Sequence, residues 1–161
     1  DWFDPFGAED NRQGHGMDVW KYIYKSYVVL SARVTVELIN NASKNVHACL
    51  CTVPENVYDS VASAQTNPRA KSIILTKGTG AGNRGFLSTG WVSMNDIRRK
   101  SLADDSMVAL LGASPTTQVE AQLYFTNVQS GNTADIYINT TVEQKILLFR
   151  PLAISNADQP A

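Results

Sequence analysis

Apolar and polar residues alternate along several parts of this chain, whereas no long stretch has the spacing of an amphipathic helix. The longest alternation runs from Val28 to Leu38, where every second residue is apolar and most residues between them are polar. Side chains two residues apart share one face of a strand, so this pattern predicts a long strand with one face in a core. The Asn40-Asn41 pair predicts a turn, and residues 46–53 are expected to be the second strand of a hairpin.

Four further segments are predicted to be strands, and loops of very unequal length separate them. They are residues 71–76, 86–94, 119–126 and 134–149. In the last of these, Ile136, Ile138 and Val142 share one face. The phase of the alternation slips near Gln144, which predicts a bulge or bend there.

Strands joined by short hairpin turns and long crossings are typical of a Greek-key or jelly-roll sandwich rather than an up-and-down meander. We therefore predict an all-β fold: a single jelly-roll sandwich of two four-stranded antiparallel sheets with long loops. Eight strands require two short or bent ones, which we expect near residues 105–111 and within the long final run. No long helix is expected, only one or two helical turns within residues 17–25 and one within residues 57–64.

The composition indicates one domain with much of its surface covered by partners. The chain has 161 residues, of which 43% are hydrophobic and only 18% are charged, against about 25% charged in ordinary domains. No stretch approaches about 18 consecutive apolar residues, so no membrane span is expected. We divide the chain into an irregular lead-in (residues 1–16), a jelly-roll domain (17–151) and a loose C-terminal tail (152–161).

The net charge of −1 excludes a uniformly basic nucleic-acid binder, but the charges are unevenly distributed. Residues 69–100 contain seven bases and one acid, whereas residues 1–18 contain five acids and one base. This asymmetry indicates either a surface that faces a polyanion or complementary patches that join copies of the chain. The residues expected to contact nucleic acid are Arg98, Arg99, Lys100, Lys71 and Arg69.

Aromatic residues are dense before the first strand, in a part of the chain that cannot form a core of its own. The lead-in carries three of them among several Pro and Gly residues that break regular structure. These side chains must lie against the body of the domain or against another copy. The residues expected at a subunit interface are Trp2, Phe3, Phe6, Trp20, Tyr22 and Tyr24.

The chain offers little chemistry for catalysis or metal binding. One histidine, His15, lies in the Gly-flanked lead-in. The other, His47, shares a strand face with Cys49 and Cys51, but three such residues span about 13 Å along a strand. A zinc ion needs all of its ligands within about 2.3 Å. We expect the cysteines to be free, buried thiols, and we expect no enzyme activity, catalytic residue, cofactor or metal.

Residues 80–85 match the pattern G-x-G-x-x-G. The dinucleotide-binding fingerprint requires a helix directly after this pattern, because the helix N-terminus holds the phosphate. The sequence that follows, FLSTGWVSM, has the composition of a strand. A Gly-rich loop between two strands is therefore the interpretation that we favour.

Three groups of motifs follow one another along residues 17–151. A D-x-W segment, Y-x-x-Y and an alternating strand with a terminal Asn are formed by Asp18, Trp20, Tyr24, Tyr27, Val29, Ser31, Val34, Val36 and Asn40. NPRAKSIILTKGTGAGNRG and WVSMNDIRRKSL follow, and the final strands end in Phe149-Arg150. Together these motifs resemble the capsid proteins of small circular Rep-encoding single-stranded DNA viruses, the circovirus-like group.

The resemblance implies a jelly roll that self-assembles into a small icosahedral shell, most simply of about 60 copies, around a single-stranded DNA genome. The implied partners are other copies, single-stranded nucleic acid and a host receptor, and the implied locations are the virion and, during assembly, the host nucleus or cytoplasm. The arginine-rich arm of that family is not found in residues 1–16, so we expect it before Asp1 or expect packaging to depend on the folded body. The alternatives are a coat protein of a small RNA or satellite virus and a lectin-like β-sandwich recognition module.

Overall fold

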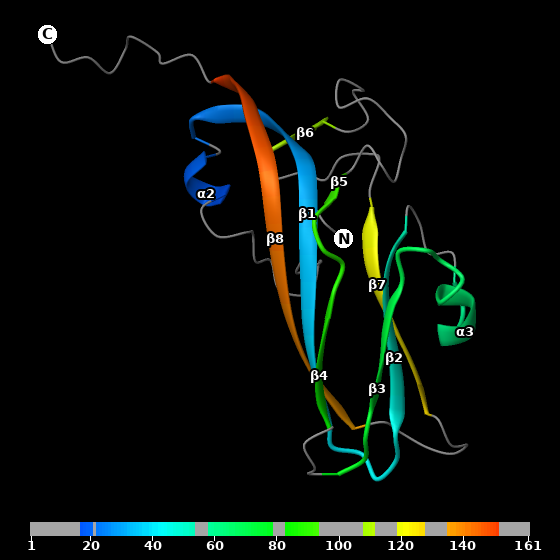
Figure 1. Cartoon of the computed structure of the whole chain (residues 1–161). Helices are drawn as coiled ribbons and strands as arrows, with labels where there is room; N and C mark the ends of the chain where they lie inside the picture. Colours follow the sequence, from blue (N-terminus) through cyan, green and yellow to red (C-terminus); the bar gives the residue numbers. More distant parts are fainter. Residues whose placement is uncertain are drawn as a thin grey trace, which may run out of the picture.

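The structure is a computed structural model, and it describes residues 17–20, 22–53, 58–78, 83–93, 108–111, 119–127 and 135–151. Over these residues the chain forms eight strands in two antiparallel sheets, with two single-turn helices (Figure 1). The predicted all-β sandwich of two antiparallel sheets is therefore confirmed. No helix in this part of the chain is long and apolar enough to cross a membrane.

The elements follow one another along the chain with short helices before β1 and between β2 and β3. They are α2 (Met17–Trp20), β1 (Tyr24–Asn40), β2 (Val46–Val53), α3 (Val61–Ala64), β3 (Lys71–Leu75), β4 (Arg84–Ser88), β5 (Val92–Ser93), β6 (Val108–Leu110), β7 (Glu120–Asn127) and β8 (Ile136–Pro151). The six clearly predicted strands are present, and so is a short strand near residues 105–111. The final run, however, forms the single strand β8 without the additional strand expected within it, and the strand expected over residues 86–94 is divided into β4 and β5.

The first sheet is organised around β1. Along one edge β1 pairs with β8 from Tyr24 to Asn40, and along its other edge it pairs in turn with β6, β5 and β4. The second sheet has the order β3-β2-β7. Among the described residues the strands therefore divide five and three, not four and four as predicted. The reason is the length of β1, whose 17 residues accommodate three short strands end to end.

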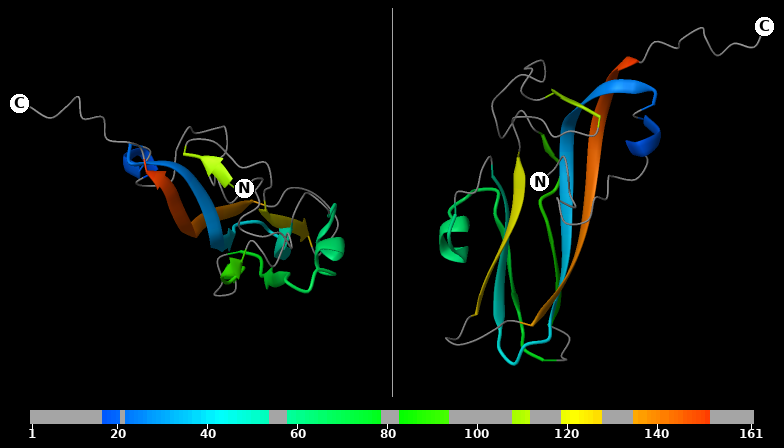
Figure 2. Two further views of the ribbon diagram at one scale, coloured as in Figure 1. Left: turned by 90° about the horizontal axis from the view of Figure 1, so that it is seen from above. Right: turned by 180° about the vertical axis from the view of Figure 1, so that it is seen from behind.

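The two sheets are linked by a nested pairing of strands. The first strand, β1, pairs with the last, β8, and the second, β2, pairs with the second to last, β7. Both sheets are thus built from the two ends of the chain, which gives the fold its jelly-roll-like character. Figure 2 shows the two sheets side by side, with α3 on the outer side of the sheet that contains β2.

The predicted hairpin between β1 and β2 is wrong, because the two strands lie in different sheets. The turn residue Asn40 is fully buried. Its Nδ2 donates to the carbonyl oxygens of Lys44 at 2.8 Å and Thr76 at 3.0 Å, and its Oδ1 accepts from the backbone N–H of Ala42 at 2.9 Å. Asn40 therefore ties the sheets together where the chain crosses from one to the other.

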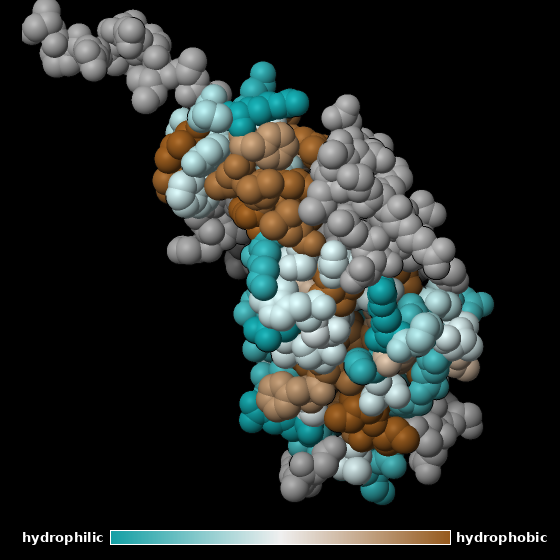
Figure 3. Space-filling model, turned by 45° about the horizontal axis from the view of Figure 1, so that its top comes forward, coloured by the Kyte–Doolittle hydropathy of each residue, from teal (hydrophilic) through white to brown (hydrophobic). Residues whose placement is uncertain are grey.

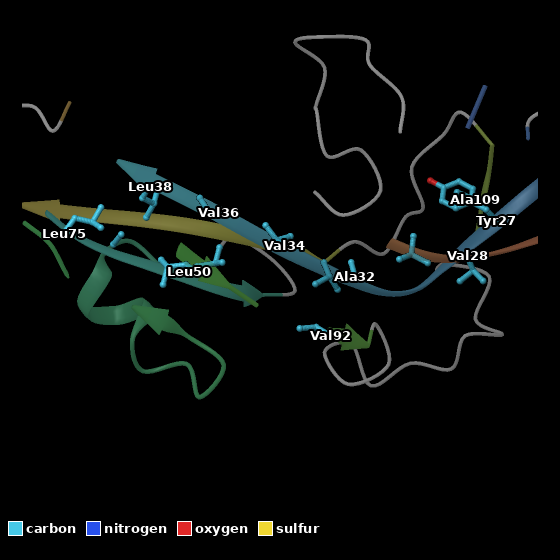
Figure 4. Close-up of a cluster of buried hydrophobic side chains, with 14 residues drawn as sticks. Tyr27, Val28, Ala32, Val34, Val36, Leu38, Leu50, Leu75, Val92 and Ala109 are labelled. Atoms are coloured by element: carbon cyan, nitrogen blue, oxygen red, sulfur yellow. The ribbon is translucent and has the colours of Figure 1, made fainter. Parts of the chain in front are cut away.

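The main core lies between the sheets and follows the alternation of β1. Val34, Val36 and Leu38 are buried on the inner face, and they pack with Leu50 and Leu75 of the other sheet (Figure 4). Removing large aliphatic side chains from water is the dominant favourable contribution to such a fold. The buried alternate positions therefore explain why β1 forms one long strand with this face inward.

A second, smaller cluster lies on the outer side of β2, under α3. Cys49 and Cys51 are fully buried there with Val61 and Ala64 of the helix. Both cysteines are free and buried, as expected. The helix begins at a capping box in which the Ser60 side chain accepts from the backbone N–H of Ser63. Because the main core covers one face of β2 and α3 covers the other, this strand is buried on both faces.

The irregularity that we expected in β8 near Gln144 lies in its partner strand instead. The register between the two strands shifts between Val29 and Ser31 of β1, while β8 runs on without interruption. An extra residue in β1 accommodates the mismatch. Because β8 stays regular, Gln144 remains on the same face as Ile146 and Leu148.

Candidate nucleic-acid and subunit interfaces

A bulge lies at the break between β4 and β5. From Ser88 to Val92 the chain advances four residues, while the opposite stretch of β1 advances only three, from Thr35 to Ala32. One extra residue is therefore accommodated at this point. Gly90 has φ +68°, a left-handed conformation that glycine adopts without a clash of a Cβ atom.

Two hydrogen bonds to β1 anchor the bulge. The backbone N–H of Thr89 donates to the carbonyl oxygen of Val34, and the N–H of Val34 donates to Thr89 Oγ1, both at 3.0 Å. Trp91 follows directly and is 44% exposed, whereas Val92, the next residue, is buried. The bulge thus leaves a large aromatic side chain at the surface.

Two cationic side chains lie over the ring of Trp91. Nζ of Lys145, from β8, is 4.5 Å from the ring centroid, and Cζ of Arg33, from β1, is 5.2 Å from it. Cations within about 6 Å are attracted to the electron-rich face of an indole. Arg33 belongs to the outer face of the sheet, because the residues on either side of it along β1 are buried in the core. Lys145 belongs to the same face, because it lies opposite Ser31, two residues from Arg33.

A carboxylate holds Arg33 in place. Nε and Nη2 of Arg33 donate to the two carboxylate oxygens of Glu143 at 2.5 and 2.7 Å. Such a two-point ion pair fixes the plane of the guanidinium group. Through these hydrogen bonds Arg33 lowers the pKa of Glu143 below its usual value, and Glu143 raises the pKa of Arg33. Both groups are therefore charged at neutral pH.

A pocket of about 240 Å³ adjoins the indole. Its lining residues are Pro68, Arg69, Lys71, Thr89, Trp91 and Val92. Arg69 and Lys71 are exposed, and neither forms an ion pair with any described carboxylate. The site therefore combines an aromatic ring with four bases and one carboxylate, which can hold a planar ring against the indole and an anionic group beside it.

The structure places the predicted nucleic-acid contacts in two groups. Arg69 and Lys71 come together at the Trp91 pocket. Residues 98–100, with Arg98, Arg99 and Lys100, lie outside the described part of the chain. Sequence reasoning missed Trp91 as a site residue, although a tryptophan directly after a glycine within a strand-like segment was a usable signal.

The predicted interface aromatics in α2 and β1 lie at one end of the molecule. Trp20 is 43% and Tyr22 74% exposed, and the rings of Trp20 and Tyr24 lie 6.1 Å apart between centroids. Two other exposed apolar residues, Leu110 and Leu147, pair with the neighbouring part of β1. Figure 3 shows apolar side chains gathered at this end, where β1 begins and β8 ends. Trp2, Phe3 and Phe6 lie outside the described residues.

The remaining candidate chemistry lies around β2. His47, Cys49 and Cys51 share the outer face of this strand, as predicted, and Gln65 Nε2 lies 3.2 Å from His47 Nε2. Burial raises the pKa of both thiols, and burial together with the nearby Cys49 raises that of Cys51 to about 11. Thiols in this state are poor nucleophiles. The described residues contain no cluster of three or more His, Cys, Asp or Glu side chains able to hold a metal ion.

No protein-family model matches this chain, and no curated protein sequence matches it. Among solved structures, a chain from Desmodium yellow mottle tymovirus is similar, with a TM-score of 0.43 and 11% sequence identity over 89% of this chain and 71% of that one. At this identity and TM-score the similarity carries no inference about what the chain does.

Proposed function

We propose that this chain is a viral coat protein whose copies assemble into a closed shell around single-stranded nucleic acid. The observation that carries the proposal is the Trp91 site. An exposed indole lies there beneath Arg33 and Lys145 and beside a pocket edged by Arg69 and Lys71. This combination suits a polymer that offers unpaired bases and phosphates together.

Each part of the site matches one part of a single strand. An unpaired base can stack on the indole, an interaction of about 1–3 kcal/mol that every base can make. The side chains of Arg69 and Lys71 can bind phosphate by releasing counterions, without regard to sequence. A coat protein must accept any segment of a genome, so binding without sequence specificity is what the function requires.

The surface of the single chain supports self-assembly. Large apolar side chains at the end of the molecule where β1 begins, such as Trp20, Tyr22 and Leu110, are 43% to 74% exposed. Exposed apolar groups gathered on one part of a surface are typical of protein interaction sites, and permanent assemblies bury large apolar interfaces. Subunits of a shell would cover these side chains for one another.

The resemblance of residues 17–151 to circovirus-like capsid proteins favours a DNA genome and a shell of about 60 copies. In this proposal the chain has no catalytic role and no cofactor, and it resides in the virion. The same stacking and phosphate contacts would serve an RNA genome equally well, so the nucleic acid must be identified by experiment.

Electron microscopy of the purified protein tests the proposal. We expect uniform closed particles whose ultraviolet absorbance ratio at 260 and 280 nm indicates nucleic acid, and DNase or RNase treatment after particle opening would identify it. A protein that stays monomeric or trimeric would contradict the proposal. So would binding of neutral sugars, rather than oligonucleotides, at Trp91 with no dependence on salt, which is the result expected of a lectin-like module.

A further inference from the structure

The edge of β8 that faces away from β1 is the longest free strand edge in the described part of the chain. Along its 16 residues β8 pairs with β1, and no other described strand pairs with it. All side chains from Tyr137 to Thr141 are exposed. A free edge presents unpaired N–H and C=O groups that can pair with another strand.

In the part of the chain that the structure describes, the sandwich is open on the same side. Ile138 lies opposite the fully buried Leu38 and so belongs to the inner face, yet it is 45% exposed. On the other side, where β3 meets β4, the sheets are in close contact. A Cβ atom on Gly85 would come within 2.4 Å of Ile73 Cδ1 and 2.9 Å of Leu75 Cδ2. Over the described residues, the free edge of β8 is therefore also the side on which the core is left uncovered.

We propose that β8 pairs antiparallel with β8 of a second copy, about a two-fold axis at Gln144. This pairing continues the five-stranded sheet from one copy into the other, with outer face meeting outer face. It places Glu143 opposite the partner's Lys145, and Lys145 opposite the partner's Glu143. On the inner face it places Val142 opposite the partner's Ile146.

The charges on β8 favour this register over its neighbours. A shift of the axis by one residue places either Glu143 opposite the partner's Glu143 or Lys145 opposite the partner's Lys145, and a parallel in-register pairing does both. Like charges directly opposite one another destabilise a sheet, whereas opposite charges stabilise it. Charged side chains often prevent edge pairing, but here their spacing permits one self-complementary arrangement.

The side chain at the axis supports the same register. The Nε2 atom of Gln144 is buried and has no hydrogen-bond partner among the described residues. Directly opposed residues in antiparallel strands have Cβ atoms about 4.5–5.5 Å apart, so this amide would meet the partner's Gln144 and could donate to its Oε1. A buried donor without a partner is unfavourable, and the pairing would remove that defect in both copies.

The structure also indicates where the pairing ends. Arg150, next to the last residue of β8, has φ +56°, which interrupts the extended backbone, so regular pairing would run from Asn139 to Phe149. Within it, Leu147, which is 52% exposed, would lie opposite the partner's Thr141. The Trp91 sites of both copies would then lie on one continuous face, because Lys145 and Glu143 belong to that face.

Exchange of the two charges tests the pairing. Glu143→Lys and Lys145→Glu each place like charges opposite one another, and we expect each to weaken dimerisation roughly tenfold. An equimolar mixture of the two variants restores both opposite-charge pairs in a mixed dimer. Sedimentation velocity should show dimers in the mixture at concentrations where each variant alone is monomeric. A mixture that behaves as the sum of its components would overturn the proposal.

Cross-linking tests the register directly. Gln144→Cys places one thiol opposite another on the axis, and mild oxidation should give a disulfide-linked dimer. Thr140→Cys is the matched control on the same face, because the two copies of residue 140 would be eight residues, or roughly 27 Å, apart. The native cysteines are buried. Absence of the cross-link in a folded Gln144→Cys protein, or equal cross-linking of both variants, would refute the register.

These results can be separated from the test of the proposed coat function. Closed particles that form without a cross-link in Gln144→Cys would support the coat function and contradict the β8 pairing. Cross-linked dimers that never form particles would confirm the β8 pairing and contradict the proposed shell.

Discussion

The strands β2 and β8 are both rich in apolar residues, but their residues are buried to very different extents. In β2 seven of eight residues are buried, because β7 and β3 flank the strand and the core and α3 cover its two faces. In β8, by contrast, no residue is fully buried, although Ile, Val, Leu and Phe supply seven of its 16 residues. Position within the sheet, rather than hydrophobicity, decides this difference. Apolar groups in β2 therefore stabilise the subunit, whereas those in β8 remain available to a partner.

Truncation of one leucine in each strand should show the largest difference between β2 and β8. Leu50→Ala in β2 removes a side chain that is 1% exposed, and we expect it to lower the free energy of unfolding by about 2–5 kcal/mol. Leu147→Ala in β8, where the side chain is 52% exposed, should change it by about 0.5 kcal/mol or less. Urea denaturation of the dissociated subunit measures both. Equal losses would mean that β8 is as buried as β2.

High pH should reveal the burial of β2 through Cys51. Its pKa is raised from 9.0 to about 11, so the unfolded chain binds fewer protons than the folded protein between these values. The free energy of unfolding should then fall as pH rises from about 9 to about 11, by about 2 kcal/mol from this thiol. Cys51→Val should remove that part of the fall, and the difference between the two urea-denaturation curves isolates it from other titrating groups. Parallel curves would contradict the burial argument.

Trp91 tests whether the outer face that contains Lys145 of β8 is used for binding rather than for stability. Trp91→Ala should weaken binding of a short oligothymidylate about tenfold through loss of base stacking, with little change in the free energy of unfolding. The exposed Phe86 offers a control, since Phe86→Ala should leave the affinity unchanged. Fluorescence anisotropy of a labelled oligonucleotide measures the effect. An unchanged affinity of Trp91→Ala for the oligonucleotide would show that the indole does not contribute to binding.

The smallest expected effect concerns one phosphate contact at the same pocket. Arg69→Gln should reduce the slope of log affinity against log salt by about 0.7, the value for one contact to a single strand. Arg69 has no described carboxylate partner, so its removal leaves no buried charge behind. Titrations at several salt concentrations measure the slope. An unaltered slope would show that Arg69 does not touch phosphate.

The elements themselves could be predicted because their signals are local. The alternation of apolar residues in β1 depends on which side chains share a face, and the structure confirms it from Val34 to Leu38. The burial of Cys49 and Cys51 was equally predictable, since both lie in an apolar strand. By contrast, the Asn40 turn was assigned to a hairpin, because no local signal tells a turn within one sheet from a crossing between two.

The candidate site was only partly predictable for a related reason. Arg69 and Lys71 belong to the basic stretch that charge counting identified. Arg33 and Lys145 do not, and they are separated by more than a hundred positions along the chain. Only the register of β8 on β1 places them over one indole.

The amino-acid sequence alone thus determined that this protein is built from strands, which residues face a core, and that its bases and aromatics are unevenly distributed. These properties follow from neighbours along the chain, where side-chain periodicity and turn chemistry act. The tertiary structure alone decided that β1 and β2 belong to different sheets, that two bases lie over Trp91 beside a pocket edged by two more, and that β8 keeps an edge unpaired by any other described strand. Each of these depends on contacts between residues distant in sequence, and their energies arise only when the sheets are assembled.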